Sequence, residues 1–373
     1  MDNFETVSDE TIMDGDATDA YFLRTEEALK KKNKNPEVVA EVSADQFSDG
    51  EFEVFAGLNE AAKLLEGLPI DVDALPEGTF FDGGPVMKIS GNYLDFARYE
   101  TALLGFLSQA SGMATAANEV IEAADDISVL SFGARHIHPT IGPMLERSAY
   151  IAGCGGYSYV GAEEFMPDGA VGTMPHALIL AFGHNNQKEA FNAFNESAPE
   201  HVSRIALCDT FSDEVEEVRM AVEELGEDLD GVRLDTTSSR RGKFKEIIKE
   251  VQWELEDMGR GDVDVFVSGG ITPNQIKELN TVIDGVGVGS YISNANPVDF
   301  GLDIVVRDGE SISKRGKLSG EKSVTRENGR VSVSRNLSET MLEPLIRDGD
   351  VVRAVEMEKS RETVEKERKS LQE

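Results

Sequence analysis

The sequence has little positive charge and no long apolar run. Among 373 residues, 36 are Lys or Arg and 70 are Asp or Glu, which gives a formal net charge of −34. Nucleic-acid binding needs clustered positive charge to neutralise phosphates, so this composition argues against general DNA or RNA binding. The longest uninterrupted apolar run covers only residues 177–182. A membrane-spanning helix needs about 20 apolar residues, so we expect no membrane span.

Cysteine is almost absent as well. Cys154 and Cys208 are the only two cysteines, and neither belongs to a CxxC motif. They cannot form a disulfide framework, which fits a reducing cytoplasm. The acidic N-terminus shows neither the basic nor the apolar segment of a signal peptide. His136 and His138 lack a third ligand at metal spacing. We therefore expect a cytoplasmic protein without a resident metal site.

The acidic excess also bears on the salt concentration at which this protein would be stable. At low salt, repulsion among so many carboxylates would strain the compact state. At molar salt the screening length falls to about 3 Å, and most of that repulsion disappears. Apolar residues make up 40% of the chain, which is enough for a core. We interpret the surface as halophilic; the alternative is an ordinary acidic cytosolic protein.

The two ends of the chain show mixed patterns. Up to about residue 118, alternating strand patterns at 37–43 and 85–90 are interspersed with helical patterns at 58–68 and 94–124. Gly105 and Gly112 should weaken the last of these helices. After about residue 300 a hairpin-like stretch begins. The last twenty residues are densely charged, which is typical of a solvated helix or a frayed tail.

Between these ends, short apolar runs alternate with helical patterns such as 213–225 and 244–258. The runs cover residues 128–133, 156–160, 204–209, 231–235, 263–270 and 285–290. Near-continuous apolar strands that alternate with helices indicate a parallel sheet buried on both faces. Six such units favour a closed or nearly closed β/α barrel. No GxGxxG follows the first run, which weakens a Rossmann interpretation.

Polar residues or glycines end nearly every run, where a barrel holds its active site. Asp209 and Asp235 are candidates to orient a sugar hydroxyl or to hold Mg²⁺; each could instead cap a helix. The glycines of 268–270 and 287–290 would let backbone N–H groups approach a phosphate closely. Tight packing of strand against helix is the alternative.

Basic residues gather in three places: 135–138, 233–243 and 314–322. In so acidic a chain, such clusters indicate a polyanionic small molecule, because Arg and Lys form charge-assisted bonds to phosphate. Surface ion pairs are the alternative. His176 precedes an apolar helical stretch and is a candidate nucleophile or acid/base group, or else a buried structural histidine.

Several of these segments resemble one family when they are taken in order. They are TDAYFLRT at 18–25, SFGARH at 131–136, GTMPH at 172–176, RLD at 233–235, VSGGI at 267–271 and GVGS at 287–290. Together they resemble the nicotinate phosphoribosyltransferases, type II phosphoribosyltransferases, in an archaeal-type short form. The likeness extends over about residues 8–322.

The resemblance implies an α/β fold with an incomplete β/α barrel. The expected domains are an N-terminal α/β sandwich at 1–118, the catalytic barrel at 119–298, and a C-terminal segment at 299–373 that returns to the first domain. Some short relatives carry a cysteine-rich zinc tail. This chain has no cysteine after Lys322, so that metal site is absent.

The resemblance also implies an activity. Nicotinate and 5-phosphoribosyl 1-pyrophosphate (PRPP) would give nicotinate mononucleotide and pyrophosphate for NAD biosynthesis or salvage, with Mg²⁺ as cofactor and ATP as co-substrate. His176 would carry the phosphoryl group from ATP, and Asp235 would act near the ribose. The implied partners are these small molecules and a second subunit of a homodimer, or higher oligomer, with shared sites.

The remaining implied roles concern substrate binding. The pyridine ring and its carboxylate would meet Phe132, Arg135, Thr173 and Arg233, together with Tyr21 of the neighbouring subunit, and Asp209 is a further substrate-binding candidate. PRPP phosphates would meet Gly269, Gly270, Gly289 and Ser290, and Lys314 and Lys317 of the third basic cluster are further candidates to bind them. Two other functions stay open: a decarboxylating quinolinate phosphoribosyltransferase, which should need additional cations for a second carboxylate, and a non-catalytic regulator that binds phosphosugars or nucleotides.

Overall fold

The computed structural model describes residues 4–44, 47, 51–167, 169–200, 202–327 and 330–372. Two compact units make up the chain: Met1–Thr115 with Asn296–Glu373, and Ala116–Ala295. Within the described ranges, no helix has the length and apolar character to cross a bilayer.

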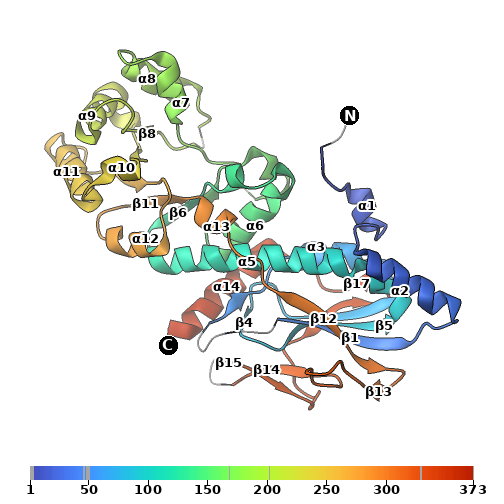
Figure 1. Ribbon diagram of the computed structural model, residues 1–373. Coiled ribbons are helices and arrows are strands. Elements are labelled where there is room, and N and C mark those ends of the chain that lie inside the picture. Colours follow the sequence, from blue (N-terminus) through green and yellow to red (C-terminus); the bar gives the residue numbers. More distant parts are fainter. Residues whose placement is uncertain are drawn as a thin grey trace. The chain divides into compact units, whose positions relative to one another are not determined.

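The first unit is built on a seven-stranded antiparallel sheet (Figure 1). Its order is β13 (Glu310–Ser311), β12 (Phe300–Arg307), β1 (Glu37–Ala44), β5 (Pro85–Asn92), β3 (Ile70–Ala74), β16 (Glu343–Arg347) and β17 (Asp350–Val351). The predicted strands at 37–43 and 85–90 are therefore confirmed. Pairing of β12 with β1 brings the segment after residue 300 into the N-terminal sheet.

Smaller elements complete this unit. They are the helices α1 (Asp9–Met13), α2 (Ala20–Lys31) and α3 (Leu58–Leu65), and two strand pairs: β2 (Glu53–Val54) with β4 (Phe80–Phe81), and β14 (Ser323–Glu327) with β15 (Arg330–Ser334). The apolar sides of α3 and the large sheet form one buried core that includes Phe55, Leu65, Val72 and Ile89. Burial of such side chains stabilises the unit by roughly 25 cal/mol per Å² of apolar surface.

The single helix predicted over 94–124 is wrong in its first turn. The segment consists of α4 (Tyr93–Phe96), a 3-10 turn at Ala97–Tyr99, and α5 (Glu100–Ala124). Phe96 leaves the helical conformation at φ −132°, which ends α4. Helix α5 runs without a break through Gly105 and Gly112, the two glycines expected to weaken it. Gly112 has a packing role: a Cβ there would collide with the carbonyl oxygen of Asn296.

The charged C-terminus is a docked helix, α14 (Met357–Gln372). Its Ser360 hydroxyl donates a 2.7 Å hydrogen bond to the Glu77 carboxylate, which is buried. The other oxygen of Glu77 accepts the backbone N–H groups of Gly57 and Leu58 at the start of α3. Val364 is also buried. One carboxylate thus joins α14 to α3.

The second unit contains a six-stranded parallel sheet in the order β7 (Gly156–Tyr157), β6 (Ser128–Ser131), β11 (Gly285–Val288), β10 (Asp264–Val267), β9 (Gly231–Leu234) and β8 (Ile205–Leu207). Each strand is shorter than the apolar run that predicted it, because the polar or glycine residues at its end enter the following loop. All six predicted strands are present.

The helices between these strands are α6 (Gly142–Ala152), α7 (His176–Phe182), α8 (Gln187–Ser197), α9 (Glu214–Leu225), α10 (Ser238–Arg241), α11 (Phe244–Asp257), α12 (Pro273–Leu279) and α13 (Ser290–Ser293). Helices α8, α9 and α11 follow one another along the outside of the sheet (Figure 1). Because β7 and β8 are the two sheet edges and do not pair with each other among the described residues, a closed barrel is wrong, and the implied incomplete barrel is confirmed.

We predict that Ser360→Ala lowers the free energy of unfolding by about 1–3 kcal/mol, because a buried carboxylate loses a hydrogen-bond donor. Urea denaturation followed by circular dichroism measures this change. Ser370→Ala is the control, since Ser370 is exposed on the same helix and its hydroxyl donates to the Glu367 carbonyl oxygen one turn earlier. Equal stability of the two variants would contradict the docking role of Ser360.

Candidate active site

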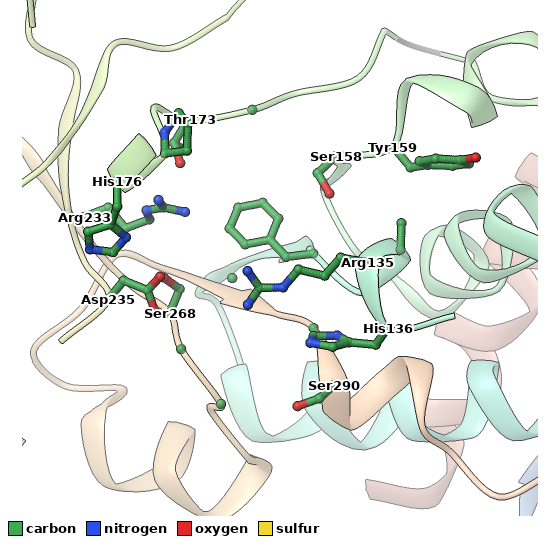
Figure 2. A pocket seen from close by; sticks show the side chains of 18 of the residues that line it. Arg135, His136, Ser158, Tyr159, Thr173, His176, Arg233, Asp235, Ser268 and Ser290 are labelled. Carbon is green, nitrogen blue, oxygen red and sulfur yellow. The ribbon is translucent and has the colours of Figure 1, made fainter. Parts of the chain in front are cut away.

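A pocket of about 960 Å³ lies at the carboxyl ends of the parallel strands in the second unit (Figure 2). Its lining comes from the loops after β6, β7, β9, β10 and β11 and from the start of α7. Predicted site residues on this lining are Phe132, Arg135, Thr173, His176, Arg233, Asp235, Gly269, Gly270, Gly289 and Ser290. Parallel strands collect their loops at one edge, so residues far apart in sequence meet here.

Asp209 connects two of the predicted catalytic residues. Its Oδ1 lies 3.0 Å from Nε2 of His176, and its Oδ2 accepts a 2.8 Å hydrogen bond from the backbone N–H of Asp235. The Asp209 side chain is only 2% exposed, whereas that of His176 is 38% exposed. The hydrogen bond to Asp209 raises the pKa of His176, because it favours the protonated ring.

Phe132 and Arg233 form one wall of the pocket. The Arg233 guanidinium lies over the Phe132 ring, with Cζ 5.7 Å from the ring centroid, and donates to the Met174 carbonyl oxygen. Burial lowers the pKa of Arg233, although Asp235 and Asp209 oppose that shift. The Phe132 ring also lies close to Gly287, where a Cβ would collide with ring carbons. A flat apolar surface and a buried cation therefore stand side by side.

The loop after β10 has the backbone shape expected for anion binding. Gly269 and Gly270 have φ values of 86° and 70°, which non-glycine residues rarely adopt. Arg241 donates to the carbonyl oxygens of Ser268 and Gly269, and also to that of Thr236. These bonds fix the positions of the three carbonyl groups. A Cβ at Gly269 would collide with the Asp235 carboxylate, so the loop approaches that side chain closely.

Three polar atoms around this pocket are buried without a hydrogen-bond partner among the described residues: Nε of Arg233, Oγ1 of Thr173 and Oγ of Ser268. An unsatisfied buried donor costs free energy unless a ligand or water completes it. Figure 2 shows the Arg135 guanidinium extending into the pocket, between Arg233 and Ser290. The arrangement suits a polar, negatively charged ligand.

Four predicted residues are not on this lining: Asp209, whose side chain is bonded to His176, and Tyr21, Lys314 and Lys317. Tyr21, Lys314 and Lys317 belong to the first unit. The Tyr21 hydroxyl donates to Asp19, and the residue is 56% exposed. Lys314 lies 2.6 Å from Asp303, and Lys317 lies 3.6 Å from the same carboxylate. The two lysines therefore form ion pairs within this unit. Ion pairing was the alternative interpretation of the basic cluster at 314–322.

Sequence reasoning did not assign a role to several residues that shape the pocket. His136, Ser158 and Tyr159 line it, and Arg241 holds its glycine loop. The basic clusters at 135–138 and 233–243 contained two of these residues and could have indicated them. Ser158 and Tyr159 follow a strand of only two residues, and the apolar run 156–160 that contains them predicted a strand rather than a site.

Comparison with known proteins places the chain in a family. A model of the "Quinolinate phosphoribosyl transferase, C-terminal domain" matches residues 113–303, and the corresponding N-terminal model matches residues 19–111. The nicotinate phosphoribosyltransferase pncB2 of Mycobacterium tuberculosis is 30% identical over 317 residues, covering 81% of this chain and 66% of that protein. The Bacillus subtilis nicotinate phosphoribosyltransferase is 26% identical over 275 residues, 70% of this chain and 54% of that protein.

Solved structures agree with this result. A nicotinate-nucleotide pyrophosphorylase from Pyrococcus furiosus is 47% identical with a TM-score of 0.95, and the match covers 100% of both chains. Human nicotinic acid phosphoribosyltransferase shares the fold, at 17% identity and a TM-score of 0.76 over 94% of this chain and 93% of that one. The chain belongs to the type II phosphoribosyltransferase family, as the motifs indicated. It spans between about half and two thirds of the curated relatives named above.

We predict that Asp209→Asn lowers the pKa of His176 toward its ordinary value, because an amide stabilises the imidazolium less than a carboxylate does. Titration of the histidine Cε1–H signals by NMR measures this change, and the exposed His184 serves as the internal control. An unchanged His176 titration would contradict the role given to Asp209.

We predict that Gly287→Ala displaces the Phe132 ring and weakens binding of a pyridine carboxylate about tenfold, since overpacking costs roughly 1–3 kcal/mol. Calorimetric titration measures the dissociation constant. Gly261→Ala is the matched control, because that glycine does not line the pocket and its nearest neighbour for a Cβ is at 3.6 Å. Equal affinities would show that Gly287 does not set the ring position.

Proposed function

We propose that this protein is a nicotinate phosphoribosyltransferase of NAD biosynthesis or salvage. It would join nicotinate to PRPP, form nicotinate mononucleotide and release pyrophosphate, assisted by ATP hydrolysis. The observation that carries the proposal is His176, which is bonded to Asp209 and shares the pocket lining with the glycine loop after β10. This arrangement supports a histidine that acts beside a bound phosphate.

The pair supports a nucleophilic role for one ring nitrogen. With Nε2 of His176 donating to Asp209, the lone pair of the neutral ring is on Nδ1. That nitrogen would attack the terminal phosphorus of ATP, the bond to the leaving ADP oxygen would break, and the phosphoryl group would stay on the ring until water removes it. Asp209 stabilises the positive charge that the ring acquires.

The wall of Phe132 and Arg233 suits the second substrate. A pyridine ring would stack on Phe132, and the carboxylate would meet the unpartnered Nε of Arg233 and the guanidinium of Arg135. Quinolinate has two carboxylates. No lysine is present on the described lining, and Arg233 already donates to a backbone carbonyl, which favours a substrate with one carboxylate.

The transfer itself needs little covalent chemistry from the protein. The pyridine nitrogen attacks the anomeric carbon of PRPP, the carbon–oxygen bond to pyrophosphate breaks, and positive charge develops on the ribose. Asp235 faces the pocket and would stabilise that charge, while Gly269, Gly270, Gly289 and Ser290 would bind the 5-phosphate. Fixing both reactants in one pocket supplies a further part of the rate enhancement.

Mg²⁺ fits this pocket as a companion of pyrophosphate. Magnesium in such sites is commonly held by one or two carboxylates and by substrate phosphates. Asp235 is the carboxylate on the lining that would take part, since both oxygens of Asp209 already accept hydrogen bonds. When bound, the ion would neutralise charge on the departing pyrophosphate.

Quinolinate phosphoribosyltransferase is the second candidate, because both matching family models carry that description. The assay supplies PRPP, Mg²⁺ and high KCl, with nicotinate, quinolinate or nicotinamide, and with or without ATP. We expect mononucleotide and pyrophosphate from nicotinate, with ATP stimulation. Quinolinate turnover with CO₂ release would favour the second candidate. PRPP binding without any pyrophosphate release would favour a non-catalytic regulator.

We further propose a homodimer with shared sites, in which Tyr21 of one subunit faces Phe132 of its neighbour. The 56% exposure of Tyr21 supports this proposal, since an exposed aromatic residue can pack against a partner. A closed two-fold dimer would have two such sites.

His176→Ala should abolish ATP-stimulated turnover and retain slow ATP-independent transfer, because the phosphoryl acceptor is removed while the base and PRPP sites remain. Initial rates with and without ATP measure both parts. Unchanged ATP hydrolysis and stimulation in the variant would refute the role of His176.

Mixing Tyr21→Ala with His176→Ala subunits should restore ATP-stimulated activity, up to about a quarter of wild type by random pairing. Each hybrid dimer would combine both lesions in one site and leave the other intact. Native mass spectrometry verifies that hybrids form. Hybrids that form and stay inactive would refute the shared site.

A further inference from the structure

Glu217 is a fully buried carboxylate that the proposed chemistry does not use. It lies in the first turns of α9 and is 0% exposed. No lysine or arginine pairs with it within the described part of the chain. An isolated buried charge is costly, so a residue kept in this state needs strong compensating hydrogen bonds.

Four donors supply that compensation. Oε1 of Glu217 accepts the backbone N–H groups of Phe211 and Ser212, and Oε2 accepts that of Thr210 at 2.8 Å and the side-chain amide of Gln187 at 2.7 Å. Three of the donors are consecutive backbone groups. Such a run of N–H groups makes a concave site for an anion, and Glu217 fills it.

The segment that Glu217 holds follows Asp209 directly. On the other side of Asp209, the backbone N–H of Cys208 bonds to Arg233 on the neighbouring strand β9. The backbone is thus held on both sides of Asp209: by the sheet at Cys208, and by Glu217 at residues 210–212. Its carboxylate has to reach His176 and the Asp235 N–H simultaneously, so a small shift of its backbone would break one or both bonds.

We propose that Glu217 is a positioning residue that holds Asp209 in the orientation required to direct His176. The part of this inference that concerns turnover rests on the proposed function, in which His176 receives a phosphoryl group. The geometric part concerns only Glu217, Asp209 and His176 and is tested without any substrate.

The substitution Glu217→Gln tests the geometric part. An amide must turn its NH₂ group toward one of the two donor pairs, so at least one backbone N–H of residues 210–212 loses its acceptor. Asp209 then moves, and the pKa of His176 falls toward its ordinary value, in the same direction as in Asp209→Asn. The other charged groups that act on His176, Asp235 and Arg233, are unchanged in sequence.

Two matched controls separate positioning from general loss of stability. Glu216→Gln makes the same chemical change one residue earlier, at an exposed position of α9. Asp213→Ala removes the N-cap of that helix, whose Oδ1 accepts the Glu216 N–H at 3.0 Å. Both controls should leave the His176 titration unchanged. Should Glu217→Gln fail to fold, Glu217→Asp keeps the charge but shortens the side chain, and it should shift the titration in the same direction.

The measurements are an NMR titration of the histidine ring signals without ligand, and initial rates with nicotinate and PRPP with and without ATP. We expect a lowered His176 pKa and a loss of ATP stimulation of about tenfold or more, since small misplacements of reacting groups have large effects on rate. An unchanged His176 titration in both Glu217 variants overturns the positioning role. A wild-type protein without ATP stimulation overturns the proposed function instead, while a shifted titration still supports the positioning of Asp209.

Discussion

The Asp209 carboxylate is the interaction on which the pocket depends. One oxygen bonds to His176, and the other accepts the backbone N–H of Asp235. A single buried group therefore fixes the ends of β8 and β9 relative to each other and to His176. A carboxylate with both oxygens bonded keeps its orientation. The raised pKa of His176 follows from that bond, as does the choice of Nδ1 as the free ring nitrogen.

The fold brings these residues together because it is an incomplete barrel of short parallel strands. Each strand ends where a polar residue or glycine begins the loop, and parallel alignment places all these ends at one edge. Glycine has two separate uses at this edge. At Gly287 it leaves room for an aromatic ring, and at Gly269 and Gly270 it permits a backbone conformation that other residues disfavour.

Much of this arrangement was predictable from sequence. The apolar runs that end in Asp209 and Asp235 located two strands and their loops, since burial on both faces leaves a strong composition signal. The motifs around Phe132 and His176 predicted the family correctly. These signals are local, because each depends on residues within one strand or one loop.

The rest depends on contacts between distant segments. Nothing in the charged pattern of α14 shows that Ser360 reaches Glu77, and nothing in the pattern of α9 shows that Glu217 turns inward to hold residues 210–212. The barrel is incomplete because β7 and β8 do not pair with each other in the described part of the chain, and the sequence of a single strand does not predict this. Pairing partners of single polar side chains are fixed only when the whole sheet is assembled.

The central claim is that His176 accepts a phosphoryl group from ATP while Asp209 holds its ring. Peptide mapping by mass spectrometry after incubation with ATP and Mg²⁺, under conditions that preserve phosphohistidine, tests it most directly. The account predicts one phosphoryl group on His176, lost when nicotinate and PRPP are added and much reduced in Asp209→Asn. Absence of the modification in a protein that is nevertheless stimulated by ATP, or its presence on another residue, would contradict the account.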